Sequence, residues 1–309
     1  MSFLNIGKNK EKNKEKNPGH RAGIVCCSNG QPPQAEKTLE NLREYLSGIG
    51  LEPVFTEYIY QKNSVFSGTA RQRAESLMSF YRDPEISVIF DISGGDLANE
   101  VLPYLDYDVI ASSGKEFWGY SDLTTVINAI YARTGKSSVL YQVKNLVSAE
   151  GASRQAAFEN TLLKSGSDLY DISVRFLQGK QLEGILIGGN IRCLLKLAGT
   201  QYWPDMSGKV LLLEALGGDV PKMATYLSQL NQLHVFDQIS GVLLGTFTEM
   251  EKNGYAPSVE ELIKQYVNEK TPVAKTREIG HGKNAKAVRI GAEIVLDSRQ
   301  VDKNGKQCG

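Results

Sequence analysis

The feature that most constrains the fold is a short, largely apolar run at 86–92 that ends directly in Ser93-Gly94-Gly95-Asp96. A strand that is apolar on both faces needs cover on both faces, as in a parallel sheet flanked by helices. Comparable runs occur at 21–27, 51–60, 115–120, 184–190, 209–214 and 239–247. Apolar residues at helical spacing lie between these runs, at 35–49, 69–81, 122–133 and 220–233. This alternation predicts an α/β protein with parallel sheets.

Composition divides the chain into a tail and two larger parts. Residues 1–19 are dominated by Lys, Asn and Glu and offer little to bury, so we expect a disordered tail there. The stretch 145–183 is more polar and less regular than its neighbours. We expect it to connect an N-terminal α/β domain at 20–144 to a C-terminal domain at 184–309. The last clear pair of strands is expected near 288–296.

Charge, hydropathy and cysteine usage exclude several classes of function. The 35 Lys and Arg residues balance the 35 Asp and Glu residues, which argues against a broad electrostatic surface for nucleic acid. No apolar run reaches the length of about 18 residues that a membrane helix needs, and the tail lacks the apolar segment of a secretory signal. The cysteines form no C-x-x-C pair and fit the reduced thiols of a cytoplasmic protein; they are Cys26, Cys27, Cys193 and Cys308.

Motifs for metals and cofactors are also missing from the sequence. Neither the zinc-binding pattern H-E-x-x-H nor the dinucleotide-binding pattern G-x-G-x-x-G occurs. We therefore expect no metal and no cofactor, and we look for chemistry that side chains perform alone.

Ser121 lies between the predicted strand at 115–120 and the predicted helix at 122–133. A serine at such a corner is held on a sharp turn, with the first N–H groups of the helix pointing towards it. Those groups can stabilise an oxyanion, so Ser121 is a candidate nucleophile. The same residues, Ser121-Asp122 before an apolar helix, are also an ordinary helix cap.

A serine nucleophile needs a base, and the base needs a group that orients it. Of the three histidines, His281 stands between two glycines in a predicted loop, where an imidazole is accessible. Glu214 ends the apolar run at 209–214, and carboxyl ends of strands are where α/β proteins assemble sites. Both residues also have plain alternatives, a loop histidine without a role and a strand that emerges into solvent.

Two glycine loops offer backbone contacts to a substrate. The loop Ser93-Gly94-Gly95-Asp96 could donate an N–H group to an oxyanion, and Gly188-Gly189-Asn190 could approach a substrate backbone closely. We take Gly189 and Asn190 as candidate substrate-binding residues. Each loop is equally explained as a tight turn.

Three ordered blocks of sequence resemble the LD-carboxypeptidase family of serine peptidases, which also contains the microcin-C immunity peptidases. The first block, 93–135, contains the glycine loop and FWGYSDLTT; the second, 184–214, begins GILIGGN and ends KVLLLE; the third, 280–297, begins GHG. The resemblance extends from about Arg21 to about Ser298, which is nearly the whole chain after the tail.

The resemblance implies a fold and a set of roles. Family members have an N-terminal Rossmann-like parallel-sheet domain and a C-terminal β-rich, barrel-like α+β domain, with the active site between them. It implies that Ser121 is the nucleophile and that Glu214 and His281 complete a catalytic triad. It further implies an oxyanion hole formed by backbone N–H groups, those of Asp122 and of Gly94 or Gly95.

The resemblance also implies a substrate and a setting. The family's reaction is hydrolysis of the L,D amide bond that releases terminal D-Ala from muropeptide tetrapeptides, in cytoplasmic cell-wall recycling, by a homodimer. An alternative within the family is an immunity-type peptidase that cleaves peptidyl or aminoacyl adenylate analogues. A non-catalytic α/β ligand-binding protein is an alternative of another class. The chain departs from the family pattern at two places, where Asp96 ends the first glycine loop and where Ala215-Leu216-Gly217-Gly218-Asp219 follows Glu214. These departures leave the triad intact and bear on the choice of substrate.

Overall fold

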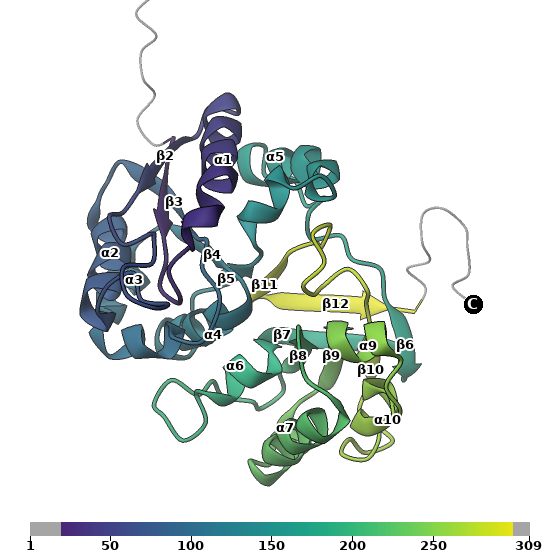
Figure 1. The fold of residues 1–309 in the computed structure, drawn as a ribbon. Helices are drawn as coiled ribbons and strands as arrows, with labels where there is room; N and C mark the ends of the chain where they lie inside the picture. Colours follow the sequence, from purple (N-terminus) through teal and green to yellow (C-terminus); the bar gives the residue numbers. More distant parts are fainter. Residues whose placement is uncertain (1–19, 299–309) are drawn as a thin grey trace, which may run out of the picture.

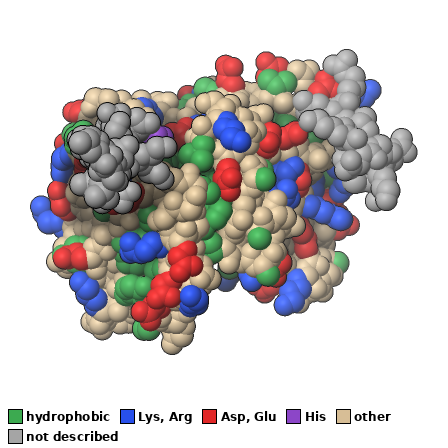
Figure 2. Space-filling model, turned by 90° about the horizontal axis from the view of Figure 1, so that it is seen from above, with side chains coloured by type: hydrophobic (Ala, Val, Ile, Leu, Met, Phe, Trp, Pro, Cys, Tyr) green, Lys and Arg blue, Asp and Glu red, His purple; other side chains and the backbone are tan. Residues whose placement is uncertain are grey.

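The computed structural model describes residues 20–298, which form two lobes that each contain one six-stranded sheet (Figure 1). The disordered tail expected at 1–19 and Cys308 lie outside the described residues. Lys and Arg side chains are interspersed with Asp and Glu over the face that Figure 2 shows, as the balanced composition suggests. No helix within 20–298 combines the length and the apolar character that crossing a bilayer requires.

The first sheet has the strand order β11-β5-β4-β3-β1-β2. Five of its strands are parallel, and β11 is antiparallel to β5. The strands are β1 (Arg21–Val25), β2 (Glu52–Phe55), β3 (Ile86–Asp91), β4 (Glu116–Gly119), β5 (Ser138–Leu140) and β11 (Val288–Ile290). The main helices are α1 (Glu36–Gly48), α2 (Ala70–Arg82), α3 (Tyr107–Ser112), α4 (Thr124–Thr134) and α5 (Gln155–Leu163). This arrangement confirms the predicted parallel α/β lobe.

Both faces of the first sheet are buried, as the apolar run at 86–92 predicted. Ile89 of β3 packs into the cluster that contains Leu77 of α2 and Ile127 of α4. Its neighbour Phe90 points to the opposite face and packs with the α1 and α5 side of the lobe, including Phe158. The alternation of side chains along a strand therefore serves two separate cores.

The second sheet has the order β12-β7-β8-β9-β10-β6, with parallel strands β7 to β10 between two antiparallel edges. Its strands are β6 (Arg175–Gln178), β7 (Gln181–Asn190), β8 (Val210–Ala215), β9 (Gly241–Phe247), β10 (Val273–Lys275) and β12 (Glu293–Asp297). The helices are α6 (Ile191–Leu195), α7 (Val220–Gln232), α8 (Val235–Gln238), α9 (Thr248–Asn253) and α10 (Val259–Ile263). The sheet curls as a half-barrel beside the first lobe (Figure 1).

Two strands do form near 288–296, but the expectation that they pair with each other was wrong. β11 joins the first sheet, where Val288 is opposite Leu140, and β12 joins the second sheet, where Leu296 is opposite Leu182. Gly291 turns the chain between them with φ +86°, and an added Cβ there would lie 2.6 Å from the Tyr131 ring. The sequence shows two strands around a turn but does not show that they enter different sheets.

Two other expectations need adjustment. The second strand, expected over 51–60, ends at Phe55. The connection at 145–183 is also more ordered than its composition indicated, because it contains α5 and β6. Phe158 of α5 is fully buried against the first sheet, so this segment contributes to a core and does more than join two lobes.

Candidate active site

Ser121 is separated from the end of β4 by Tyr120 alone and adopts φ +58°, a left-handed conformation that costs a non-glycine residue about 1–2 kcal/mol. The turn is tight, because an added Cβ on Gly119 would lie 2.8 Å from the Leu123 Cβ. The chain then passes through a 3₁₀ turn (Ser121–Leu123) into α4. A strained serine between a strand and a helix has the geometry of a nucleophile elbow. No side-chain cap hydrogen bond occurs at this helix start, which disfavours the interpretation of a simple cap.

His281 joins the serine to the carboxylate. Its Nε2 lies 3.0 Å from Ser121 Oγ, and its Nδ1 lies 2.8 Å from Glu214 Oε2. Glu214, near the end of β8, is completely buried, and its other oxygen accepts a 3.0 Å hydrogen bond from Asn190 Nδ2. With Nδ1–H donating to the carboxylate, Nε2 is free to accept the serine proton. The structure thus brings together three side chains that are far apart in the sequence.

The histidine loop is fixed by close packing. Gly280 has φ +156°, and an added Cβ would lie 1.7 Å from Thr246 Oγ1, so no larger residue fits. The Thr246 N–H donates to the Ile279 carbonyl at 2.8 Å. The Tyr120 ring lies edge-on to the imidazole, with ring centroids 5.0 Å apart. Burial, and secondly the charge of Glu214, raise the pKa of Tyr120 well above its usual value, which keeps this ring neutral beside the relay.

The first glycine loop lies next to the serine. An added Cβ on Gly94 would be 3.9 Å from the Ser121 Cβ, which is ordinary contact distance. Gly95 has φ +118° and packs on Asn29, whose side chain would be 2.2 Å from an added Cβ. The Asn29 N–H donates to the Gly94 carbonyl at 3.1 Å, and Asn29 Oδ1 accepts from the Asp96 N–H at 3.1 Å. The loop is therefore held in one conformation beside the candidate nucleophile.

The two candidate substrate-binding residues of the second glycine loop lie in different surroundings. Gly189 lies against Thr124 of α4, whose Oγ1 would be 2.7 Å from an added Cβ, so it faces the other lobe and not the cavity. Asn190 does line the cavity, but its amide nitrogen binds Glu214 and its oxygen accepts from the Cys193 N–H. Asn190 thus orients the carboxylate. The sequence could not reveal this, because it depends on β7 lying beside β8.

A cavity of about 340 Å³ opens over Ser121 between the two lobes. Its charged and aromatic lining was not identified from the sequence: Arg192, Lys222, Tyr226 and Glu249. Only the position of α6, α7 and α9 after strands of the second sheet could have suggested these residues. Asp96 and Gly95 complete the wall on the side of the first lobe. Among residues 20–298, no three His, Cys, Asp or Glu side chains converge on a point where a metal ion could bind.

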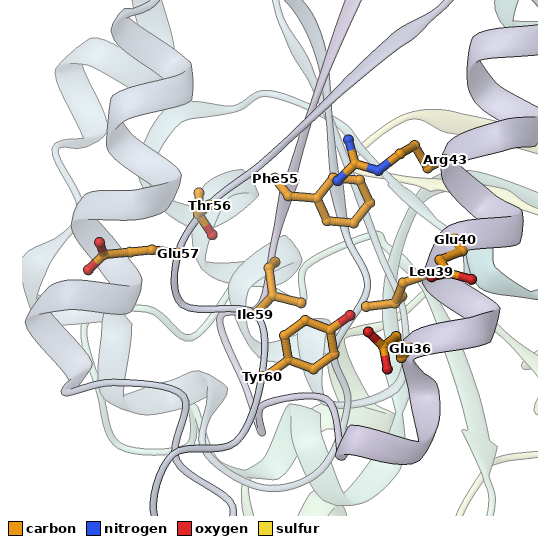
Figure 3. Close-up of a pocket in the computed structure, with 9 residues that line it drawn as sticks. All are labelled: Glu36, Leu39, Glu40, Arg43, Phe55, Thr56, Glu57, Ile59 and Tyr60. Carbon is orange, nitrogen blue, oxygen red and sulfur yellow. The ribbon is translucent and has the colours of Figure 1, made fainter.

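A larger hollow, about 460 Å³, lies elsewhere, between α1 and the segment after β2. Figure 3 shows the Arg43 guanidinium over the Phe55 ring, 4.4 Å from its centroid, with Tyr60 below. Its lining contains no serine or cysteine and no histidine that could serve as a base, so it offers no serine–histidine or cysteine–histidine pair. The smaller cavity over Ser121 therefore remains the candidate active site.

Comparison with known proteins finds two family models and several relatives that cover most of the chain. Residues 22–141 match the family model of the LD-carboxypeptidase N-terminal domain, and residues 183–296 match that of the LD-carboxypeptidase C-terminal domain. A probable murein peptide carboxypeptidase of Bacillus subtilis is 25% identical over 299 residues, 94% of this chain and 92% of the relative. The murein tetrapeptide carboxypeptidase of Pseudomonas aeruginosa is 27% identical over 281 residues, 86% of this chain and 91% of the relative.

A solved structure has the same fold. The structure of MccF in complex with glutamyl sulfamoyl guanosine superimposes with a TM-score of 0.81 at 21% identity, covering 91% of this chain and 94% of that one. At this identity the superposition establishes the two-lobed fold and no more.

Proposed function

Because the chain belongs to the LD-carboxypeptidase family, we propose that it releases terminal D-Ala from muropeptide tetrapeptides by hydrolysing their L,D amide bond. The chain is a serine peptidase, and two relatives are named for murein peptides. The observation that carries the proposal is the hydrogen-bonded series Ser121–His281–Glu214 beneath an open cavity.

The reaction begins with proton transfer from Ser121 Oγ to His281 Nε2 as the oxygen attacks the scissile carbonyl. Glu214 holds the imidazole by its Nδ1–H and stabilises the cation that forms. His281 then protonates the leaving amine of D-Ala, and the acyl-enzyme remains on Ser121. Water then attacks the acyl carbonyl and gives a proton to His281 Nε2. His281 returns this proton to Ser121 Oγ as the acyl–oxygen bond breaks, which frees the shortened peptide with a new carboxyl group and restores the serine hydroxyl.

The oxyanion of each tetrahedral intermediate is stabilised by the N–H of Asp122 and an N–H of Gly94 or Gly95. The position of Gly94, where an added Cβ would lie 3.9 Å from the Ser121 Cβ, supports this assignment. Preorganised donors of this kind typically contribute about 10²–10³ each to the rate. The strained backbone at Ser121 also supports the assignment of the oxyanion hole. In such a turn the serine hydroxyl is exposed and the N–H group of the next residue points towards the carbonyl oxygen that the serine attacks.

A second candidate substrate is an aminoacyl or peptidyl adenylate analogue. The observation in its favour is Tyr226 on the cavity wall, an aromatic ring of the kind on which nucleobases stack. Arg192 and Lys222 on the same wall suit either an adenylate-type anion or a peptide carboxylate.

The decisive test is mass spectrometry of purified protein incubated with murein tetrapeptide, with and without a chelator. We expect wild type to release D-Ala in both conditions, Ser121→Ala to release none, and Ser112→Ala, an exposed serine on α3, to match wild type. Cleavage by Ser121→Ala would reject the nucleophile. Cleavage of an aminoacyl sulfamoyl adenylate but not of tetrapeptide would favour the second candidate.

We also infer from the family resemblance a cytoplasmic homodimer. Light scattering at several concentrations tests the dimer: a mass near twice 34.0 kDa is expected, and a constant mass near 34.0 kDa would exclude it.

A further inference from the structure

Asp122, the residue after the candidate nucleophile, has a completely buried carboxylate. Three separate segments bind it. Ser28 Oγ donates to its Oδ2 at 2.6 Å, and the Ala98 N–H donates to the same oxygen at 2.9 Å. Lys196 Nζ donates to Oδ1 at 2.5 Å and supplies the compensating positive charge. A carboxylate buried this deeply is costly unless it is paired and hydrogen-bonded, so the contact with Lys196 is a requirement of the site.

Lys196 comes from the other lobe. It directly follows α6, the short helix that begins after Asn190, and its side chain is only 18% exposed. Its ammonium also donates to the backbone carbonyl of Asp96 at 2.8 Å. One charged group therefore joins the segment that carries Ser121 and Asp122 to the end of the glycine loop.

Further contacts brace the same two segments. Ser28 Oγ accepts from the Leu97 N–H at 3.2 Å, and the Ser28 N–H donates to Ser93 Oγ at 2.9 Å. One helical turn before Lys196, Arg192 donates to the Gly95 carbonyl at 2.9 Å and pairs with the Asp96 carboxylate. The glycine loop is thus held at both ends, by Ser28 from its own lobe and by α6 from the opposite lobe.

We propose that Lys196 is a positioning residue that fixes the separation of the two sets of N–H donors forming the oxyanion hole. The inference rests on the proposed serine-peptidase mechanism and adds a component from the second lobe that touches no reacting atom. Oxyanion donors act by being preorganised where charge develops, so a shift in their spacing weakens a contact made only in the transition state. Removing a donor slows reactions by about 10²–10³; displacing one should slow this reaction by about 10–100-fold.

The test compares Lys196→Met, Lys196→Arg and the control Lys180→Met, an exposed lysine at the start of the second lobe. Steady-state hydrolysis of tetrapeptide gives kcat and KM, and a fluorophosphonate probe gives the rate at which Ser121 is phosphonylated. For Lys196→Met we expect kcat and the labelling rate to fall about 10–100-fold while KM stays within about twofold, because the ground state does not use the oxyanion hole. We expect Lys196→Arg to recover most of the loss and Lys180→Met to match wild type.

The outcomes separate this inference from the mechanism beneath it. Wild type that neither hydrolyses nor labels would overturn the proposed function. Wild type that does both, while folded Lys196→Met matches it, would overturn the positioning role alone. If kcat fell equally in Lys196→Arg and Lys196→Met while the rate of Ser121 phosphonylation stayed at the wild-type value in both, Lys196 would contribute to packing and not to the oxyanion hole.

A double variant keeps the proposal testable if Lys196→Met does not fold. If Lys196→Met leaves the Asp122 charge so costly that the protein unfolds, the double variant Lys196→Met/Asp122→Asn removes the charge and keeps the backbone N–H. The folded double variant should be slow to the same degree as expected for Lys196→Met. Wild-type kcat and labelling in that variant would refute the proposal.

Discussion

Replacing Glu214 by glutamine tests most directly how the proposed base, His281, is oriented. The substitution preserves the shape of the Glu214 side chain and removes its charge. Glu214 Oε2 faces His281 Nδ1 at 2.8 Å, and Oε1 faces Asn190 Nδ2 at 3.0 Å. Asn190 cannot simply turn round, because its own oxygen accepts from the Cys193 N–H. Both of these hydrogen-bonding partners therefore present donors to the carboxylate, whereas a glutamine has only one accepting oxygen.

Either orientation of the introduced glutamine side chain damages the relay. With its oxygen towards Asn190, its NH₂ group faces His281 Nδ1, which must then accept, so the proton moves to Nε2 and the base is lost. With its oxygen towards His281, two NH₂ groups face each other in a fully buried position, at a cost of about 1–3 kcal/mol. We expect the first orientation to dominate.

The size of the effect follows from the lost charge and the wrong tautomer. With charge centres about 4 Å apart and an effective dielectric constant of about 20, imidazolium–carboxylate attraction is about 4 kcal/mol. At about 1.4 kcal/mol per factor of ten, this corresponds to about 10³ in rate. The wrong tautomer raises the expected loss in kcat to about 10³–10⁴, as in other serine–histidine relays.

The assay is D-Ala release by mass spectrometry, with circular dichroism to establish that the variant is folded. The double variant Glu214→Gln/Asn190→Asp supplies a matched control. An aspartate in place of Asn190 accepts from the glutamine NH₂ group, which turns the glutamine oxygen towards His281 Nδ1 and restores the useful tautomer. We expect it to recover at least about tenfold over Glu214→Gln. Activity of folded Glu214→Gln within about tenfold of wild type would refute the reasoning.

Three further predictions follow from local geometry. Ser121→Gly should be inactive yet about 1 kcal/mol more stable to denaturant than the equally inactive Ser121→Ala, because only glycine relieves the left-handed backbone; equal stability would contradict the strain. Gly280→Ala should lower kcat at least about tenfold by displacing the histidine loop, since its Cβ would lie 1.7 Å from Thr246 Oγ1; unchanged kcat would show that the loop adapts. Burial raises the pKa of three thiols, so in a Cys308→Ser background an aromatic disulfide reagent at about pH 8 should modify them only after unfolding; a native-state reaction would contradict their burial. They are Cys26, Cys27 and Cys193.

Much of the first lobe could be predicted because its signals are local. The run at 86–92 became β3, the helical spacing at 122–133 became α4, and Gly135 caps that helix with φ +71°. Ser121, Glu214 and His281 also stand at local signals, each at the end of a strand or between glycines, but each signal had a plain alternative and the triad as a set was implied by the family resemblance. Periodicity and turn chemistry report on neighbours in the sequence, and these features depend on such neighbours.

Features that depend on the order of strands in the sheets could not be predicted from the sequence. Nothing near Lys196 indicates that its partner is Asp122, 74 residues earlier, because that contact exists only once α6 lies over the carboxyl edge of the first sheet. The same holds for Gly189, which meets Thr124 because β7 approaches α4. The split of 288–296 into two sheets likewise follows from which edges are free, since a strand's own residues are compatible with either edge.

The way the lobes are joined argues for a site that is assembled before substrate arrives. One apolar cluster contains Ile127 of α4 together with Leu186 of β7 and Leu212 of β8, so the lobes share a core. Asn128 of α4 bonds both the N–H and the carbonyl of Gly188, at 2.8 and 2.9 Å, inside that interface. Hinge opening would expose this apolar surface and break these buried hydrogen bonds, which opposes large domain motion. Because the relay and the glycine loop are both fixed across the interface, we expect discrimination between substrates to depend on the exposed rim of the cavity. Lys222 lies there and can change without disturbing the catalytic geometry, whereas Glu249 accepts from the Gly218 N–H at 2.7 Å and holds the loop that follows Glu214.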